Sequence, residues 1–176
     1  MTTLDDLKGR TVAAGSPTSS ELRLIPGLQL RALGLDLEQD CTLADIEPRP
    51  ASNGVRWIDD FLIFDAVKDG NADAGLIFEP WLAHLTRKRG MAPEDITVIW
   101  RSEPYCHCAF TARPELPIDM GDRFVELLTA MQPDDPRVSE MMKLEHLTRW
   151  LPATDAGWSA LIDAIRDRHL EGTTFN

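Results

Sequence analysis

The sequence predicts an α/β protein with a mostly parallel sheet. Short apolar runs, typical of buried strands, alternate with longer stretches whose apolar residues recur at helical spacing. Each of the first three strands is followed by a helix, and the chain then continues with two strands and three helices. This alternation favours parallel pairing, because each helix returns the chain to the start of the next strand.

The first elements can be justified by their local signals. A helical turn at residues 2–7 begins with threonine caps and two aspartates. The run TVAA predicts a strand at 11–14, and a helix at 21–33 ends at Gly34. Pro26 lies inside this helix, so a kink or a late start is expected there.

The later elements follow from the same patterns of spacing and chain breaks. Gly90 ends one of the helices, and in the C-terminal helix Trp158, Leu161, Ile162 and Ile165 share one face. The further strands are predicted at residues 43–50, 72–78, 96–100 and 106–111. The further helices are predicted at residues 57–67, 80–89, 121–131, 139–150 and 157–169.

The charge balance excludes several classes of partner. The chain of 176 residues carries 29 acidic against 18 basic side chains, a formal net charge of −11. Nucleic-acid and anionic-membrane binders need clustered Lys and Arg, so neither partner is expected. The apolar runs are too short to span a bilayer, so no membrane insertion is predicted.

The N-terminus and the cysteines bear on the compartment. The start MTTLDDL lacks a basic segment followed by an apolar one, so a cytoplasmic location is expected if Met1 is the natural start. A periplasmic location is expected if the chain is a truncated piece. Three cysteines, two of them one residue apart, do not make a disulfide framework.

The first candidate site is the turn between the first strand and the next helix. Ser16, Thr18, Ser19 and Ser20 place hydroxyls beside a helix N-terminus, where backbone N–H groups attract a phosphate, phosphonate, sulfonate or carboxylate. The alternative is simple helix capping, since no lysine follows as in a P-loop.

The second candidate is Glu79, which follows the predicted strand at 72–78. A carboxylate beyond the C-terminal end of a parallel strand points toward the crevice where α/β sheets bind ligands. It could accept hydrogen bonds from a ligand amine or hydroxyl. The alternative is an exposed loop glutamate that caps the helix beginning at Pro80.

The third candidate is the segment SEPYCHCAF. Cys106, His107 and Cys108 are metal-ligand types, but three adjacent ligands do not easily close one tetrahedral site, so neither a metal nor a cofactor is predicted. Cys106 activated by His107 would be a nucleophile. Tyr105, the single tyrosine, could form the wall of a pocket.

Taken together, several segments resemble one family. Residues 6–20, DLKGRTVAAGSPTSS, resemble the DLKGKxVAxGxxxS opening of the second lobe of substrate-binding proteins from phosphate/phosphonate-type ABC transporters. Residues 66–75 resemble that family's AVxxGxxDAG segment, and residues 102–111 are similar to the TPPYxHCxFT crossover of one branch.

The resemblance implies a type 2 periplasmic-binding fold with a ligand cleft between two α/β lobes. It implies one complete lobe in residues 1–100, and a crossover strand and helices of an incomplete second lobe in residues 101–176. A homo-oligomer or a partner chain is then expected to complete that lobe. By position, the ligand contacts fall on Ser16, Thr18, Ser19, Ser20, Glu79, Tyr105, Cys106 and His107.

Three functions remain open from the sequence. The first is a binding module for a small anionic or zwitterionic molecule. The second is a cytoplasmic enzyme or enzyme subunit that uses the same cleft with Cys106, His107 and Glu79. The third is a structural subunit of a larger assembly, without a ligand of its own.

Overall fold

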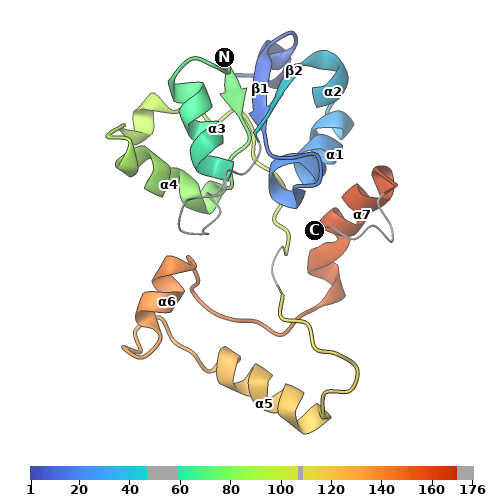
Figure 1. Ribbon diagram of the computed structural model, residues 1–176, viewed down its shortest axis with the longest axis vertical. Helices are drawn as coiled ribbons and strands as arrows, with labels where there is room; N and C mark the ends of the chain where they lie inside the picture. The colour runs from blue at the N-terminus through green and yellow to red at the C-terminus, as the bar shows by residue number, and fades with distance from the viewer. Residues whose placement is uncertain (47–58, 107–108, 170–176) are drawn as a thin grey trace. The chain divides into compact units, whose positions relative to one another are not determined.

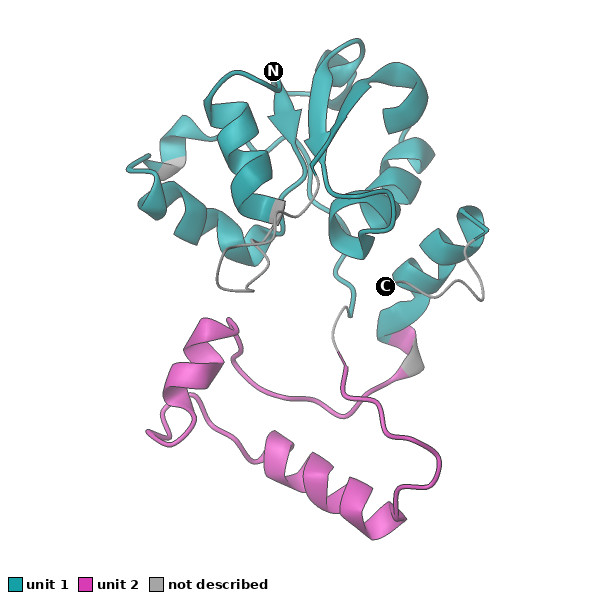
Figure 2. Ribbon diagram, in the orientation of Figure 1, with its two compact units in different colours: residues 1–107, 157–176 teal, residues 108–156 magenta. Residues whose placement is uncertain are grey.

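The chain divides into two compact units in a computed structural model of the protein (Figures 1 and 2). The structure describes residues 1–46, 59–106 and 109–169. Unit 1 comprises residues 1–107 and 157–176, and unit 2 comprises residues 108–156. The division into domains at residue 100 that the resemblance implies stays a prediction.

Unit 1 is built on a parallel sheet of three strands. The strands are β1 (Thr11–Ala14), β2 (Thr42–Asp45) and β3 (Ala74–Gly75), in the order β2-β1-β3. Side chains alternate across the central strand. Val12 packs into a core with Leu30 and Leu35, whereas Ala13 packs into a second core with Leu22 and Ile63. The predicted α/β class with a parallel sheet is therefore confirmed.

Helices cover both sides of this sheet, with α1 and α2 on one side and α3 and α4 on the other (Figure 1). A short helical turn, η1 (Leu4–Leu7), precedes β1, and its capping carboxylate Asp6 accepts hydrogen bonds from the N–H groups of Thr2 and Thr3. The other helical elements of unit 1 are η2 (Ser20–Leu24), α1 (Ile25–Ala32), α2 (Leu37–Asp40), α3 (Asp59–Lys68), α4 (Glu79–Lys88), η3 (Pro93–Asp95) and α7 (Ser159–Asp167), while η4 (Asp155–Trp158) spans the boundary between the two units.

The helix predicted at 21–33 forms in two parts. Its first turn, η2, is a π-helix, and the α-helical part α1 begins at Ile25 with a proline in its first turn. The expected late start at Pro26 is not what forms, because the chain is already helical from Ser20 and Leu24, which precedes α1, has helical backbone angles. Pro26, which has no N–H to donate, therefore follows directly after a π-helical turn.

Two predicted strands do not form. Residues 96–100 belong to no strand, and neither do residues 106 and 109–111, the described part of the second predicted strand. Apolar side chains still place the first segment, because Ile99 and Trp100 pack against the core around Val12. The alternation of apolar and polar residues in this segment therefore reflects one side of the segment being buried, and the segment does not pair with a strand.

Unit 2 contains helices but no strand among its described residues. These helices are α5 (Ile118–Thr129) and α6 (Ser139–Leu144). The helix predicted at 139–150 ends early, since His146 adopts a left-handed φ of 55° and the N–H of Leu147 donates to the carbonyl of Met142. Met142 is the one fully buried apolar side chain in the described part of this unit.

Within the described residues, no helix has both the length and the apolar character needed to cross a bilayer.

Candidate functional site

The loops that follow β1 and β3 meet at one edge of the sheet. β1 is the central strand, and the chain leaves it first toward β2 and later returns on its other side as β3. The N–H of Leu76, just after β3, donates to the carbonyl of Ala13 at 3.0 Å. In open α/β sheets, ligands bind outside the carboxyl ends of the strands where the strand order reverses. The candidate site lies at this edge.

Gly15 makes the turn after β1 tight. Its N–H donates to the carbonyl of Leu22 at 3.1 Å, which pulls the start of the following helix against the strand end. A Cβ at Gly15 would lie 2.7 Å from the Cβ of Leu22 and 3.1 Å from the Cβ of Ser19. Position 15 therefore requires a glycine, because the following helix lies too close to leave room for a side chain. The resulting turn holds the hydroxyl-bearing residues 16–20 at the sheet edge.

The four hydroxyl residues of this turn differ in their roles. Ser19 is the N-cap of η2, and its Oγ accepts a hydrogen bond from the N–H of Leu22 at 3.3 Å. The hydroxyl of Ser20 donates to Glu21 Oε2 at 2.8 Å. Ser16 is half-buried and Thr18 is exposed. Capping thus accounts for Ser19, while Ser16 and Thr18 have no side-chain hydrogen bond among the described contacts.

Glu79 begins α4 at the same edge of the sheet. Its Oε1 accepts a hydrogen bond from Arg101 Nε at 2.7 Å, and both side chains are about 60 % exposed. The pair links the start of α4 to the segment at residues 96–104, which has no regular secondary structure. Because an exposed ion pair of this kind is weak, a ligand group could replace either partner.

Asp60, which the sequence prediction left out, holds the loop after β3. It lies in the first turn of α3, is only 5 % exposed, and accepts a hydrogen bond from the N–H of Phe78 at 2.6 Å. A buried carboxylate that accepts a hydrogen bond from the backbone beside the candidate site is an expected site residue. The contact joins residues 18 positions apart, so no local motif signals it.

Tyr105 is half-buried against the apolar cluster of Leu24, Ile25 and Ala164. Burial, with a smaller contribution from the charges of Glu21 and Asp60, raises the pKa of its hydroxyl to about 12. The phenol therefore stays protonated at neutral pH and can donate a hydrogen bond. Glu21 lies in η2 and Asp60 lies in α3, and both contribute to this rise in pKa.

Cys106 has a structural contact. Its N–H donates to the carbonyl of Gly157 at 2.7 Å, and its Sγ lies where a side chain on Gly157 would begin. The thiol is exposed. His107 and Cys108 fall outside the described residues, so the predicted Cys106–His107 pair is not tested. No cluster of three His, Cys, Asp or Glu suited to a metal ion occurs in residues 1–46, 59–106 and 109–169.

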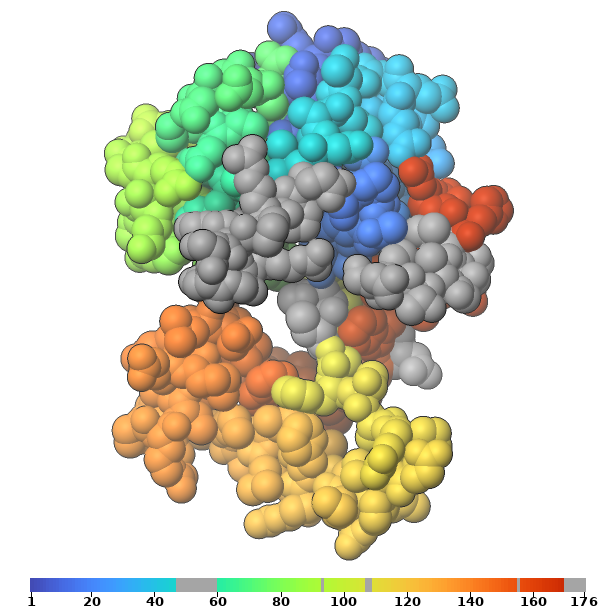
Figure 3. Space-filling model, in the orientation of Figure 1, coloured from blue at the N-terminus to red at the C-terminus, as the bar shows by residue number. Residues whose placement is uncertain are grey.

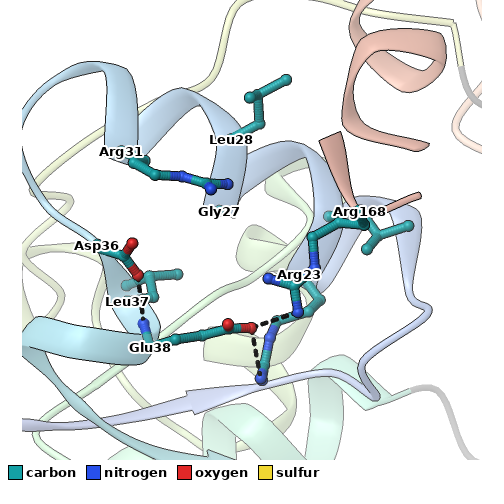
Figure 4. A pocket seen from close by; sticks show the side chains of 9 residues that line it. Arg23, Gly27, Leu28, Arg31, Asp36, Leu37, Glu38 and Arg168 are labelled. Carbon is teal, nitrogen blue, oxygen red and sulfur yellow. Dashed lines mark hydrogen bonds and ion pairs between the residues drawn. The ribbon is translucent and has the colours of Figure 1, made fainter. Parts of the chain in front are cut away.

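A second group of charged residues lines a cleft between η2, α1, α2 and α7 (Figure 4). Arg23, whose side chain is 9 % exposed, contacts Asp45 at 2.6 Å and Glu38 at 3.6 Å. Arg168 contacts the same Glu38 at 2.5 Å, and its hydrogen bond holds the pKa of that carboxyl below its usual value. These guanidinium groups already have carboxylate partners, and the pair between Arg168 and Glu38 holds the end of α7 against α2 within unit 1.

A comparison with known families identifies the family of the chain. Residues 1–158 match the family described as "ABC transporter, phosphonate, periplasmic substrate-binding protein". The match covers most of the chain, and the protein therefore belongs to this family of phosphonate-binding periplasmic substrate-binding proteins. The resemblance inferred from the sequence is confirmed, and an anionic ligand is the general expectation for the family.

Proposed function

We propose that unit 1 binds a small anionic or zwitterionic ligand of the phosphonate, phosphate, sulfonate or carboxylate class at the carboxyl ends of β1 and β3. The observation that carries the proposal is the tight turn at Gly15, which holds Ser16 and Thr18 beside a helix N-terminus at the reversal of strand order. Hydroxyl and backbone donors at such a point suit an anionic oxygen.

The neighbouring charges favour a ligand with a cationic pole as well. Glu21 and Asp60 both lie close enough to Tyr105 to raise its pKa, and Glu79 stands at the same edge of the sheet. A dianion alone would be repelled by these carboxylates. An ammonium group would reduce this repulsion, so an aminoalkyl-phosphonate is the preferred ligand class.

Each remaining predicted contact has a role in this proposal. Tyr105 would donate a hydrogen bond from its protonated phenol, and Glu79 would exchange its exposed pair with Arg101 for the ligand. Cys106 and His107 would line the wall of the cleft. No described contact favours the enzymatic alternative.

The proposal extends to location and assembly. The family suggests a periplasmic location for the natural protein. We propose in addition that a second copy or a different chain completes the lobe to which unit 2 belongs, since unit 2 buries so little of its own apolar surface.

Titration calorimetry and thermal melting of the full chain test the ligand proposal. An aminoalkyl-phosphonate, methylphosphonate, phosphate and sulfate would be compared as ligands. At about a hundred times its dissociation constant, a ligand adds roughly 2.7 kcal/mol of stability, which is a shift of about 5–10 °C for a chain of this size.

A pair of matched variants locates the site. The double variant Ser16→Ala, Thr18→Ala should weaken binding by about tenfold or more, a loss of about 1.4 kcal/mol. Ser19 and Ser20 are left intact because they hydrogen-bond within the chain. Thr42→Ala, at the opposite end of the sheet, is the control and should leave affinity unchanged. Equal affinity in the double variant would contradict the proposed site.

A further inference from the structure

The helix that follows the hydroxyls of residues 16–20 begins with a π-helical turn. The N–H of Leu24 donates to the carbonyl of Ser19 at 2.9 Å, five residues back along the chain. The N–H of Ile25 donates in the same way to the carbonyl of Ser20. An α-helix would use the carbonyls four residues back. Single π-helical turns inside helices are rare and are frequent at functional sites.

Pro26 accounts for the wide winding of this turn. In an α-helix the carbonyl of Leu22 would accept the N–H of residue 26, but proline has no N–H, and its ring collides with the carbonyl four residues back. A π-helical turn spreads the same stretch over one more residue and relieves this collision. Pro26 is buried, so its ring has no room to swing away from the helix.

The carbonyl of Leu22 is bonded to the end of β1 instead. It accepts the N–H of Gly15 at 3.1 Å, and the N–H of Leu22 donates to Ser19 Oγ at 3.3 Å. The N–H of Ser19 in turn donates to the carbonyl of Ser16 at 2.9 Å, which closes the hydroxyl-bearing turn. The close contact at Gly15 is therefore made through a carbonyl to which Pro26 has no N–H to donate.

The residues next to the π-helical turn are held in place by other elements. Leu24 and Ile25 pack with Ala164 of α7, and in the space-filling view the red segment of α7 lies against the blue segment of η2 and α1 (Figure 3). Arg23 is paired with Asp45 at 2.6 Å. One residue of an α-helix corresponds to about 100° of rotation. Closing the π-helical turn to an α-helical one would therefore swing the hydroxyl-bearing turn around the helix by about that angle.

We infer that Pro26 is a positioning residue for the proposed anion site. Its ring keeps the carbonyl of Leu22 out of the α-helical ladder, and that carbonyl, bonded to Gly15, sets the distance between the end of β1 and the hydroxyl-bearing turn. The inference rests on the function proposed above and goes beyond it, because it gives a part in ligand binding to a residue that does not touch the ligand.

Amide hydrogen exchange of the full chain, followed by NMR, tests the backbone step. In the parent protein the Gly15 amide should exchange within about tenfold of the Ile46 and Leu76 amides, which donate to carbonyls of the same strand end. In Pro26→Ala the new N–H draws the carbonyl of Leu22 toward the helix axis. The Gly15 amide should then exchange at least about tenfold faster, while the two reference amides do not. A loss of overall stability would accelerate all three amides together.

Titration calorimetry with aminomethylphosphonate tests the binding step. Pro26→Ala should weaken binding by at least about fivefold, because the hydroxyls and the backbone donors no longer converge on the ligand. Leu30→Val is the matched control, since it trims a buried side chain of the same helix and adds no N–H. It should lower Tm, but it should change affinity and the relative exchange of Gly15 by less than about twofold.

Three results would overturn the inference. One needs no variant: the Gly15 amide of the parent protein exchanges at the rate of an unprotected amide. The second is a Pro26→Ala protein in which Gly15 exchanges as in the parent relative to the two reference amides. The third is a Pro26→Ala protein whose affinity stays within about twofold of the parent value.

Failure of the proposed function would look different. The parent protein would then bind none of the compared anions. The exchange of Gly15 in Pro26→Ala would still decide whether Pro26 sets the turn, because that measurement needs no ligand.

Discussion

The turn at Gly15 leads to a prediction in which two Gly→Ala substitutions change stability in opposite directions. At Gly15, the new methyl group would lie 2.7 Å from the Cβ of Leu22, whereas aliphatic carbons pack at about 3.5–4.0 Å. Leu22 is 5 % exposed and belongs to the core that contains Ala13 and Ile63, so it cannot move freely. The helix start would have to shift away from the strand end.

The expected magnitude follows from two opposing effects. Overpacking of a core costs about 1–3 kcal/mol, and the stiffer unfolded chain of the alanine variant offsets about 0.4–1 kcal/mol. A net loss of about 1–2 kcal/mol lowers Tm by about 2–8 °C in a chain of this length. Because the turn also positions Ser16 and Thr18, anion binding should weaken with it.

Gly27→Ala is the matched control. Gly27 lies inside α1, and nothing stands within 4 Å of the position of its Cβ. Alanine there should stabilise the helix by about 0.5–1 kcal/mol and raise Tm by about 1–4 °C. The assay is thermal and urea unfolding of both variants. A Gly15→Ala protein that melts at or above the parent temperature would refute the reasoning.

Three further predictions concern groups outside this turn. The folded pKa of Glu38 lies below its usual 4.5, so its stabilising pair with α7 is fully present above about pH 4.5 and is lost as pH falls through the folded value. Glu38→Gln should therefore flatten the acid limb of a Tm–pH curve, and an unchanged limb would count against the pair. Ultraviolet titration of Tyr105, the single tyrosine, should show a midpoint near pH 12. Asp60→Asn should lower this midpoint, because it removes a negative charge that raises the pKa. A midpoint near the ordinary 10.0 in the folded protein would contradict the burial of Tyr105. Gly157→Ala should destabilise the protein by about 1–3 kcal/mol through contact with Cys106. Adding Cys106→Ala should restore much of that loss in urea unfolding, and no recovery would show that another contact limits the position.

Local signals were sufficient for several of the helices and for the turn after β1, although the helix predicted at 139–150 ends early. The helix predicted at 80–89 appears as α4 (Glu79–Lys88), because apolar spacing, Pro80 and Gly90 define it without distant contacts. The hydroxyl-rich turn was found in the same way. The strand predicted at 96–100 failed, because a strand requires a neighbour to pair with, and the periodicity of one segment does not supply it.

Contacts between distant residues explain what the sequence prediction missed. Asp60 became a candidate only through the N–H of Phe78, and Arg23 only through Asp45, 22 residues further along. The raised pKa of Tyr105 likewise depends on burial against Leu24 and Ile25. None of these pairs has a spacing that a linear pattern records.

The sequence by itself determined the α/β class, the acidic balance and the turn of hydroxyls at residues 16–20, because each can be read from composition or from neighbours in the chain. The tertiary structure decided the strand order β2-β1-β3, and with it which loops share an edge. It also decided which carboxylates are paired and which apolar faces remain open. Burial and ion pairing are properties of groups brought together in space, and residues far apart in the chain meet only when it folds.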